Sequence, residues 1–157
     1  MKLIGLDIGD RRIGIAFGDT TLQLATPVDV LVRSLAEQDA QALEHFIREY
    51  DAAAIIVGLP RNMDGTIGPQ AEMTRTYAEM IGARLGVPVH FWDERLTTVE
   101  AARRNEETGA RRVPGPGSRK DRRGKKTRRH LDAIAAAVIL QDYIDAQASE
   151  STEKNVA

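Results

Sequence analysis

Four acidic residues stand out because they lie where secondary structure elements are expected to begin or end. They are Asp7, Asp93, Glu94 and Asp132. Buried carboxylates repel one another and lose hydration energy unless a cation compensates them. The chain has three histidines and no cysteine, so a metal site would use mainly oxygen ligands, which favour Mg²⁺ or Mn²⁺. The acids therefore indicate a divalent metal site, provided that the fold brings them to one sheet edge.

Each acid also has an ordinary structural role open to it. Asp7 could cap the turn that follows it, and Asp93 or Glu94 could pair with Arg95. Asp132 could lie near a helix N-terminus, where a negative charge is favourable. Taken singly, these roles are at least as good an explanation as a metal site. Their shared position at element boundaries is what favours the metal site.

The elements that would carry these acids can be placed from the apolar pattern. Five β-rich stretches predict strands near residues 2–8, 12–18, 22–32, 53–57 and 88–92. The first two are joined by a polar turn and predict an antiparallel hairpin. Pro27 in the third favours an edge strand or a bend. The last two strands follow helical stretches, so we expect both of them to run parallel to the first strand. The expected fold is therefore a mixed α/β sheet of five strands with helices on both faces.

Periodicity and capping signals predict the helices between and after these strands. They lie near residues 35–50, 69–85, 99–108 and 127–146. Ser34 is the expected N-cap of the first helix, and Gly86 is the expected end of the second. The chain is long enough for one domain with a real core. We expect that single domain to cover residues 1–147 and a disordered polar tail to cover residues 148–157.

The net charge of −1 hides one strongly basic segment. Residues 103–130 contain twelve basic and three acidic side chains, and the rest of the chain is acidic. This asymmetry indicates a polyanionic partner, although a solvated loop is the plain alternative. Within the segment, the Pro- and Gly-rich residues 110–126 predict a flexible loop. The absence of cysteine fits a cytoplasmic location, and no apolar run is long enough for a membrane span.

Four motifs follow one another along the chain. They are Leu6-Asp7-Ile8-Gly9 with Arg12-Ile13-Gly14-Ile15-Ala16, then Val57-Gly58-Leu59-Pro60 with Asn62-Met63-Asp64-Gly65-Thr66, then Asp93-Glu94-Arg95-Leu96-Thr97-Thr98, and lastly Asp132 with Ala133, Ala135 and Ala136. Together they resemble the YqgF (RuvX) family of resolvase-like nucleases assigned to pre-16S rRNA. The resemblance covers about Leu3 to Tyr143. One departure is the stretch between Gly109 and Thr127, which is longer and more basic than the family pattern.

The resemblance implies a ribonuclease-H-like fold, similar to that of the RuvC junction resolvases. It implies that Asp7, Glu94 and Asp132 are both catalytic residues and ligands of Mg²⁺ or Mn²⁺, with Asp93 as the reserve ligand. The implied reaction is metal-dependent hydrolysis of phosphodiester bonds, in processing the 5′ end of pre-16S rRNA and also on DNA junctions. The implied partner is nucleic acid, with no membrane, and the chain is expected to be a monomer or a weak homodimer.

Basic side chains would hold the phosphates of the nucleic acid without reading its sequence. The candidates are Arg11, Arg12, Arg61, Arg95, Arg119, Lys120, Arg122, Arg123, Lys125 and Lys126. Trp92 is expected to be a core residue rather than a base-stacking one. Two rival functions stay open: a nucleic-acid-binding factor without catalysis, and half of an actin-like ATPase. The second is disfavoured because 157 residues leave no room for the other half of such a fold.

Overall fold

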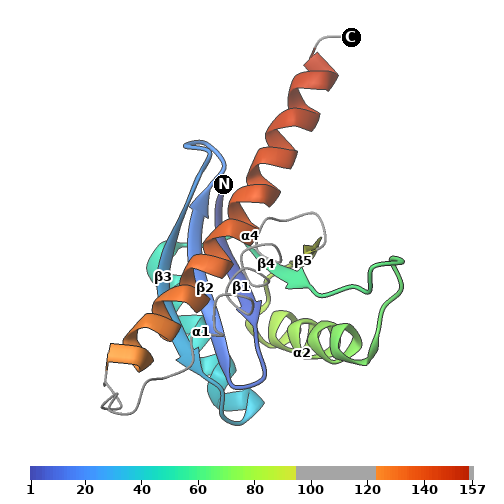
Figure 1. The fold of residues 1–157 in the computed structure, drawn as a ribbon. Coiled ribbons are helices and arrows are strands. Elements are labelled where there is room, and N and C mark those ends of the chain that lie inside the picture. Colours follow the sequence, from blue (N-terminus) through green and yellow to red (C-terminus); the bar gives the residue numbers. More distant parts are fainter. Residues whose placement is uncertain (95–122, 156–157) are drawn as a thin grey trace.

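A computed structural model describes residues 1–94 and 123–155, which form one sheet with helices on both faces (Figure 1). The strands are β1 (Lys2–Ile8), β2 (Arg12–Asp19), β3 (Leu24–Val32), β4 (Ala54–Leu59) and β5 (Val89–Asp93). The helices are α1 (Ala36–Tyr50), α2 (Pro69–Leu85) and α4 (Arg123–Asn155). The helix predicted near residues 99–108, and residues 110–122 of the predicted loop, lie outside the described residues.

The strand order in the sheet is β3-β2-β1-β4-β5. β1 and β3 each pair antiparallel with β2, whereas β4 pairs parallel with both β1 and β5. The predicted five-stranded mixed sheet is therefore confirmed. β3 is an edge strand, and its pairing with β2 shifts register between Ile15 and Ala16, opposite the segment that contains Pro27. A proline has no N–H to donate, which is why it is tolerated at an edge.

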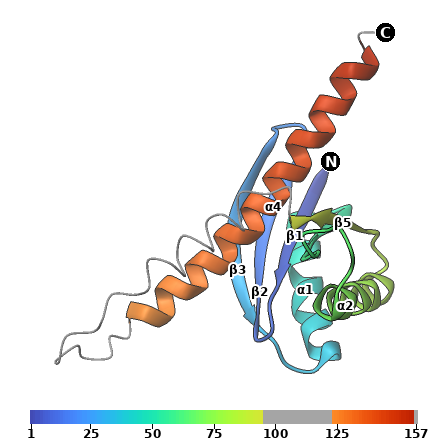
Figure 2. The same ribbon diagram turned by 45° about the vertical axis from the view of Figure 1, so that its right-hand side comes forward.

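Side chains that alternate along β1 enter two different cores. Ile4 and Leu6 pack with α1 and α2 on one face, whereas Leu3 packs with α4 on the other. Figure 2 shows the same division, with α4 crossing one face of the sheet and the other two helices behind it. Because alternate residues share a face, Gly5 and Asp7 lie on the α4 side with Leu3. The long helix therefore covers the face that carries the first candidate acid.

The start of α1 differs from the prediction. The N-cap residue is Leu35, and within the described residues no side chain makes a capping hydrogen bond there. Ser34 lies one residue before the cap position; its hydroxyl donates to the Gln38 side chain and its N–H donates to Asp39 Oδ1 at 2.9 Å. The prediction of Ser34 as N-cap is wrong for this reason. The ends of α2 match their prediction, with Pro69 in its first turn and Gly86 in the left-handed conformation after it.

The last helix is longer than predicted at both ends. α4 begins at Arg123, inside the predicted loop, and continues to Asn155. Residues 148–155 are therefore helical, and the expected disordered tail is wrong over that range. The hydroxyls of Ser149, Ser151 and Thr152 each donate to the carbonyl four residues earlier, so these polar side chains satisfy helical backbone acceptors. Within the described part of the chain, no helix is both long and apolar enough to span a membrane.

Candidate active site

Asp7 is the penultimate residue of β1 and is almost fully buried, with 6% of its surface exposed. Its cross-strand partner on β2 is Gly14. On the other side, β1 pairs with β4 as far as Leu6 opposite Val57, so the next residue in each strand brings Asp7 beside Gly58. Asp7 therefore lies between two glycines on the sheet face that α4 covers.

Gly14 allows α4 to approach the sheet directly above β2. A Cβ atom on this residue would lie 1.9 Å from the carbonyl oxygen of Asp132 and 2.5 Å from its carbonyl carbon. No side chain fits there without moving the helix or the strand. The backbone of Asp132 is thus held next to the strand pair that carries Asp7. A glycine is needed because backbone meets backbone at this contact.

Gly58 plays the corresponding part for Glu94. A Cβ atom on Gly58 would lie 2.7 Å from Glu94 Oε1, so the glutamate side chain lies over β4 next to the position of Asp7. Glu94 is buried, with 8% of its surface exposed, whereas Asp93 at the end of β5 is only partly buried. This arrangement favours Glu94 over the reserve candidate. The three elements that carry the predicted acids meet at one edge of the sheet.

The carboxylate of Asp132 is held by an arginine from the β1–β2 turn. Arg12 Nε lies 2.7 Å from Asp132 Oδ2, and the two side chains are 36% and 30% exposed. They border a hollow of about 260 Å³ together with Gly9, Asp10 and Arg11. The backbone N–H of Gly9 donates to the Arg12 carbonyl at 2.9 Å and closes the turn. Arg12 was expected to bind phosphate, and its pairing with Asp132 could not be read from the sequence.

The three carboxylates do not form a closed ligand set in this structure. Within residues 1–94 and 123–155, no group of three or more acidic or histidine side chains is close enough to hold a metal ion. The metal and catalytic roles of Asp7, Glu94 and Asp132 therefore stay predictions. The donor chemistry suits a hard divalent cation, because all three are carboxylates. The glycines at positions 14 and 58 keep bulky side chains out of the space beside Asp7.

The candidate phosphate-binding residues are placed only in part. Arg11 and Arg61 are exposed, the first at the turn hollow and the second just after β4. Arg95, Arg119, Lys120 and Arg122 lie outside the described residues. Arg123, Lys125 and Lys126 belong to the first turns of α4, where the backbone alone is described. Phosphate binding by the basic segment therefore stays a prediction.

Trp92 lies where the core interpretation expected it. It is partly buried on β5 and packs against the core under α4, edge-on to Tyr143 at 6.1 Å between ring centroids. Its indole N–H has no hydrogen-bond partner within the described residues, nor does Asp142 Oδ2. Burial, followed by the nearby charge of Asp145, raises the pKa of Asp142 above its ordinary value. These groups belong to the helix–sheet interface and not to the acid edge.

The sheet order, the covering helices and the acid edge together define a ribonuclease-H-like α/β protein. Solved structures agree on the fold. The chain is similar to RuvC from Thermus thermophilus in complex with a Holliday junction, with a TM-score of 0.53, 12% identity, and coverage of 95% of this chain and 96% of that one. It is also similar to the fowlpox virus resolvase bound to junction DNA, with a TM-score of 0.51, 12% identity, and coverage of 94% and 99%.

The family is shown by sequence. The family model RuvX, described as Holliday junction resolvase, matches residues 1–146, and the chain belongs to this family. A relative from Halothermothrix orenii named "Putative pre-16S rRNA nuclease" is 42% identical over 94% of this chain and 96% of its own length. A relative of the same name from Symbiobacterium thermophilum is 39% identical over 99% of this chain and all of its own length. The resemblance inferred from the four motifs is confirmed.

Proposed function

We propose that this protein is a divalent-metal-dependent nuclease that hydrolyses phosphodiester bonds at the edge formed by β1, β4 and the part of α4 around Asp132. The observation that carries the proposal is the meeting of the three acid-bearing elements there. Gly14 admits the backbone of Asp132 and Gly58 admits the side chain of Glu94, on either side of Asp7. Family membership and the names of the relatives support nuclease activity.

Asp7, Glu94 and Asp132 would hold the metal, Mg²⁺ or Mn²⁺. When bound, such ions activate a water molecule and stabilise the leaving oxygen of a phosphodiester. The chain itself supplies the carboxylate ligands and the narrow, largely buried setting in which Asp7 and Glu94 lie. Arg12, which pairs with Asp132 Oδ2 in the structure, would bind a backbone phosphate at the same edge. No protein nucleophile is required for this reaction.

The substrate is the finer part of the proposal. The names of the relatives favour pre-16S rRNA as the substrate, and the family description favours DNA junctions as a further substrate. We assign cleavage to the 5′ end of that RNA, in the cytoplasm, as the finer part of this proposal. A direct test is to incubate the protein with labelled precursor RNA and with branched DNA in Mn²⁺, Mg²⁺ or a chelator. We expect cleavage in both metals and none in the chelator. Cleavage of branched DNA alone would refute the assignment to rRNA.

Asp7→Asn tests the carboxylate directly. The change should abolish Mn²⁺-dependent cleavage and leave RNA binding in chelator nearly intact. Removing a repelled charge should also keep or raise the melting temperature in metal-free buffer. Asp51→Asn is the matched control, because Asp51 follows α1, has a φ of 52° and lies before β4, away from the acid edge. Asparagine accepts this backbone conformation, so the control should fold and cut normally.

Two outcomes would contradict the proposal. A folded Asp7→Asn variant that cuts at the parent rate would refute the metal-nuclease mechanism. Tight RNA binding by the parent, without cleavage in either metal, would instead support the alternative of a non-catalytic nucleic-acid-binding factor. Melting curves for each variant separate both outcomes from simple loss of folded protein.

A further inference from the structure

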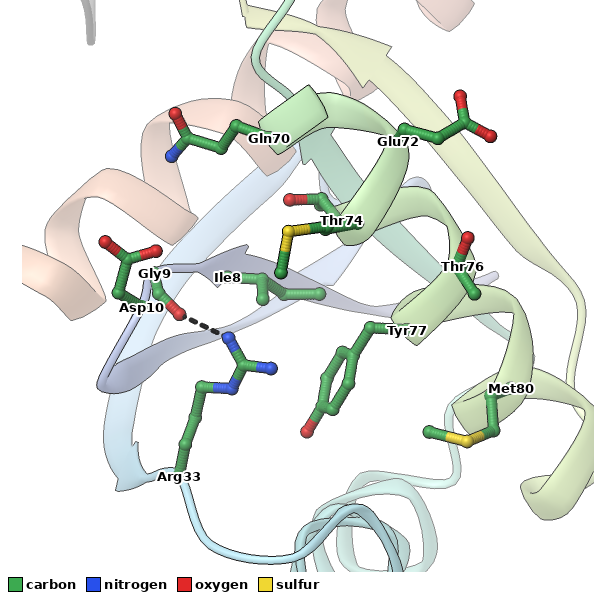
Figure 3. A pocket seen from close by; sticks show the side chains of 11 residues that line it. Ile8, Gly9, Asp10, Arg33, Gln70, Glu72, Thr74, Thr76, Tyr77 and Met80 are labelled. Atoms are coloured by element: carbon green, nitrogen blue, oxygen red, sulfur yellow. Dashed lines mark hydrogen bonds between the residues drawn. The ribbon is translucent and has the colours of Figure 1, made fainter. Parts of the chain in front are cut away.

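A second hollow lies on the opposite face of the sheet from the acids, between the β1–β2 turn and α2 (Figure 3). Its volume is about 420 Å³. Its walls are mainly apolar and come from Ile8, Met73, Tyr77 and Met80. Arg33 lies at one side, and Figure 3 shows its guanidinium and the Tyr77 ring both directed into the space below Ile8. Nothing in the proposed cleavage reaction uses this hollow.

One wall of the hollow is flat and held in place by hydrogen bonds. Arg33 Nη1 donates to the Gly9 carbonyl at 2.8 Å, and the guanidinium carbon lies 4.4 Å from the centre of the Tyr77 ring. The Tyr77 hydroxyl donates to Oδ2 of the buried Asp39 at 2.7 Å. Burial, and then this hydrogen bond, raise the pKa of Tyr77, so the hydroxyl stays protonated at neutral pH. The arginine and tyrosine therefore form a preorganised stacking surface.

The hollow adjoins the acid edge through the β1–β2 turn. Gly9 and Asp10 border both this hollow and the one that contains Asp132. Asp7 and Ile8 are consecutive residues that face opposite sides of the sheet. A strand rises only about 3.3 Å per residue, so the two faces are reached from neighbouring points of the sheet edge. A nucleic acid strand that crosses the β1–β2 turn would therefore meet the acids on one side and the hollow on the other.

We propose that this pocket binds an unpaired nucleobase of the nucleic acid strand that lies along the acid edge. The inference rests on the proposed nuclease function and adds that the substrate is single-stranded or unpaired there. Bases that leave a stack commonly lie on aromatic rings or guanidinium planes, as Tyr77 and Arg33 offer. The carboxylate of Asp10 borders the pocket and disfavours a phosphate or an acidic peptide inside it. Thr74, Thr76 and Gln70 supply hydrogen-bonding groups for base edges.

Binding of short fluorescent oligonucleotides in chelator buffer tests the pocket without cleavage. Met73→Trp fills the hollow from an exposed position of α2, and Glu79→Trp adds the same side chain to an exposed position outside it. Arg33→Lys keeps the charge but removes the flat guanidinium. We expect Met73→Trp and Arg33→Lys to raise Kd about tenfold, as loss of one stacked base does, and Glu79→Trp to leave Kd unchanged.

A single abasic site moved along the oligonucleotide identifies the base concerned. In the parent protein, one position should show a loss of affinity of about tenfold. In Met73→Trp the same abasic site should have no further effect, because the pocket is already closed. A 2-aminopurine at this position should change its fluorescence on binding to the parent and to Glu79→Trp, but not to Met73→Trp.

Equal abasic penalties in the parent and in Met73→Trp would overturn the inference. If cleavage remained normal in that case, only the base pocket would be refuted, and its occupant would be something other than nucleic acid, such as an apolar side chain of a protein partner. If the parent neither bound nor cut any RNA or DNA, the proposed function itself would fail and the pocket assignment with it. Melting curves of the three variants exclude misfolding as the cause of weaker binding.

Discussion

Gly14→Ala tests the direct contact between α4 and the sheet. The new Cβ would start 1.9 Å from the Asp132 carbonyl oxygen, and real Cβ contacts below 3.0 Å essentially do not occur. The strand and the helix must therefore separate by about 1 Å. Backbone on both sides of the contact leaves no flexible side chain to give way. Among the side chains of α4 that the structure describes, those of Ala136, Ile139, Leu140 and Ile144 are fully buried further along the helix.

Overpacking of this kind costs about 3 kcal/mol when backbone must move. For a chain of this length that corresponds to a fall in Tm of roughly 10 °C. Thermal unfolding followed by circular dichroism measures the change. Gly86→Ala is the control, because Gly86 has a φ of +68° but open space around its Cβ position. It should lose only the cost of backbone strain, about 1 kcal/mol.

The same substitution should affect cleavage more than stability alone explains. A displacement of 1 Å in a catalytic group can reduce the rate about 100-fold. Assays well below the Tm should therefore show Gly14→Ala strongly impaired and Gly86→Ala near the parent rate. A Gly14→Ala protein that melts no lower than Gly86→Ala would refute the direct backbone contact between β2 and α4.

Three further predictions concern other charged groups of the chain. Arg12→Gln should lower Tm slightly in metal-free buffer, since a partly exposed ion pair contributes about 0.5 kcal/mol. The same change should increase the Tm gain on adding Mn²⁺, because the cation no longer has a competitor at Asp132, and an unchanged gain would contradict this. The raised pKa of Asp142 means that its ionised form is disfavoured in the folded state, so the stability of the protein should fall as pH rises from about 4 through that pKa. Asp142→Asn should therefore raise Tm at neutral pH, and this gain should disappear below pH 3.8. The last prediction concerns four residues of the basic segment, namely Arg119, Lys120, Arg122 and Arg123. Replacing them by Ala should weaken nucleic-acid binding and flatten its salt dependence, and an unchanged salt slope would exclude phosphate contacts there.

The strands could be predicted because their signals are local. Alternating or continuous apolar residues over five to nine positions reflect which face of a sheet is buried, and the structure has strands at all five stretches. The two sheet-edge acids on β1 and after β5 could be placed for the same reason. The choice between Asp93 and Glu94 could not be predicted, because neighbouring residues face opposite sides of a sheet and a shift of one residue reverses which of the two faces the other acids. In the structure the Glu94 side chain lies over Gly58, and its role as a ligand in place of Asp93 stays a prediction.

Contacts between distant parts of the chain were beyond sequence reasoning. The sequence shows Gly14 only as a glycine inside a strand, whereas its partner lies 118 residues later at Asp132. The ion pair from Arg12 to the same residue is equally remote. The helical end of α4 was missed for another reason. A polar stretch indicates solvent exposure but not disorder, and helix propagation from a buried segment adds one hydrogen bond for each residue that is fixed.

The β1–β2 turn connects the two sides of the proposed nucleic-acid site. On the acid side, Arg12 binds the Asp132 carboxylate, and on the pocket side, the Gly9 carbonyl accepts a hydrogen bond from Arg33. The hydrogen bond from Gly9 to Arg12 closes the turn and fixes both contacts relative to one another. A change in the turn backbone would therefore disturb phosphate and base positions together, whereas a substitution on α2 reaches the base alone. Because scission needs the phosphate aligned with the acids, a base held across this turn would set which phosphate of an unpaired strand is presented for cleavage.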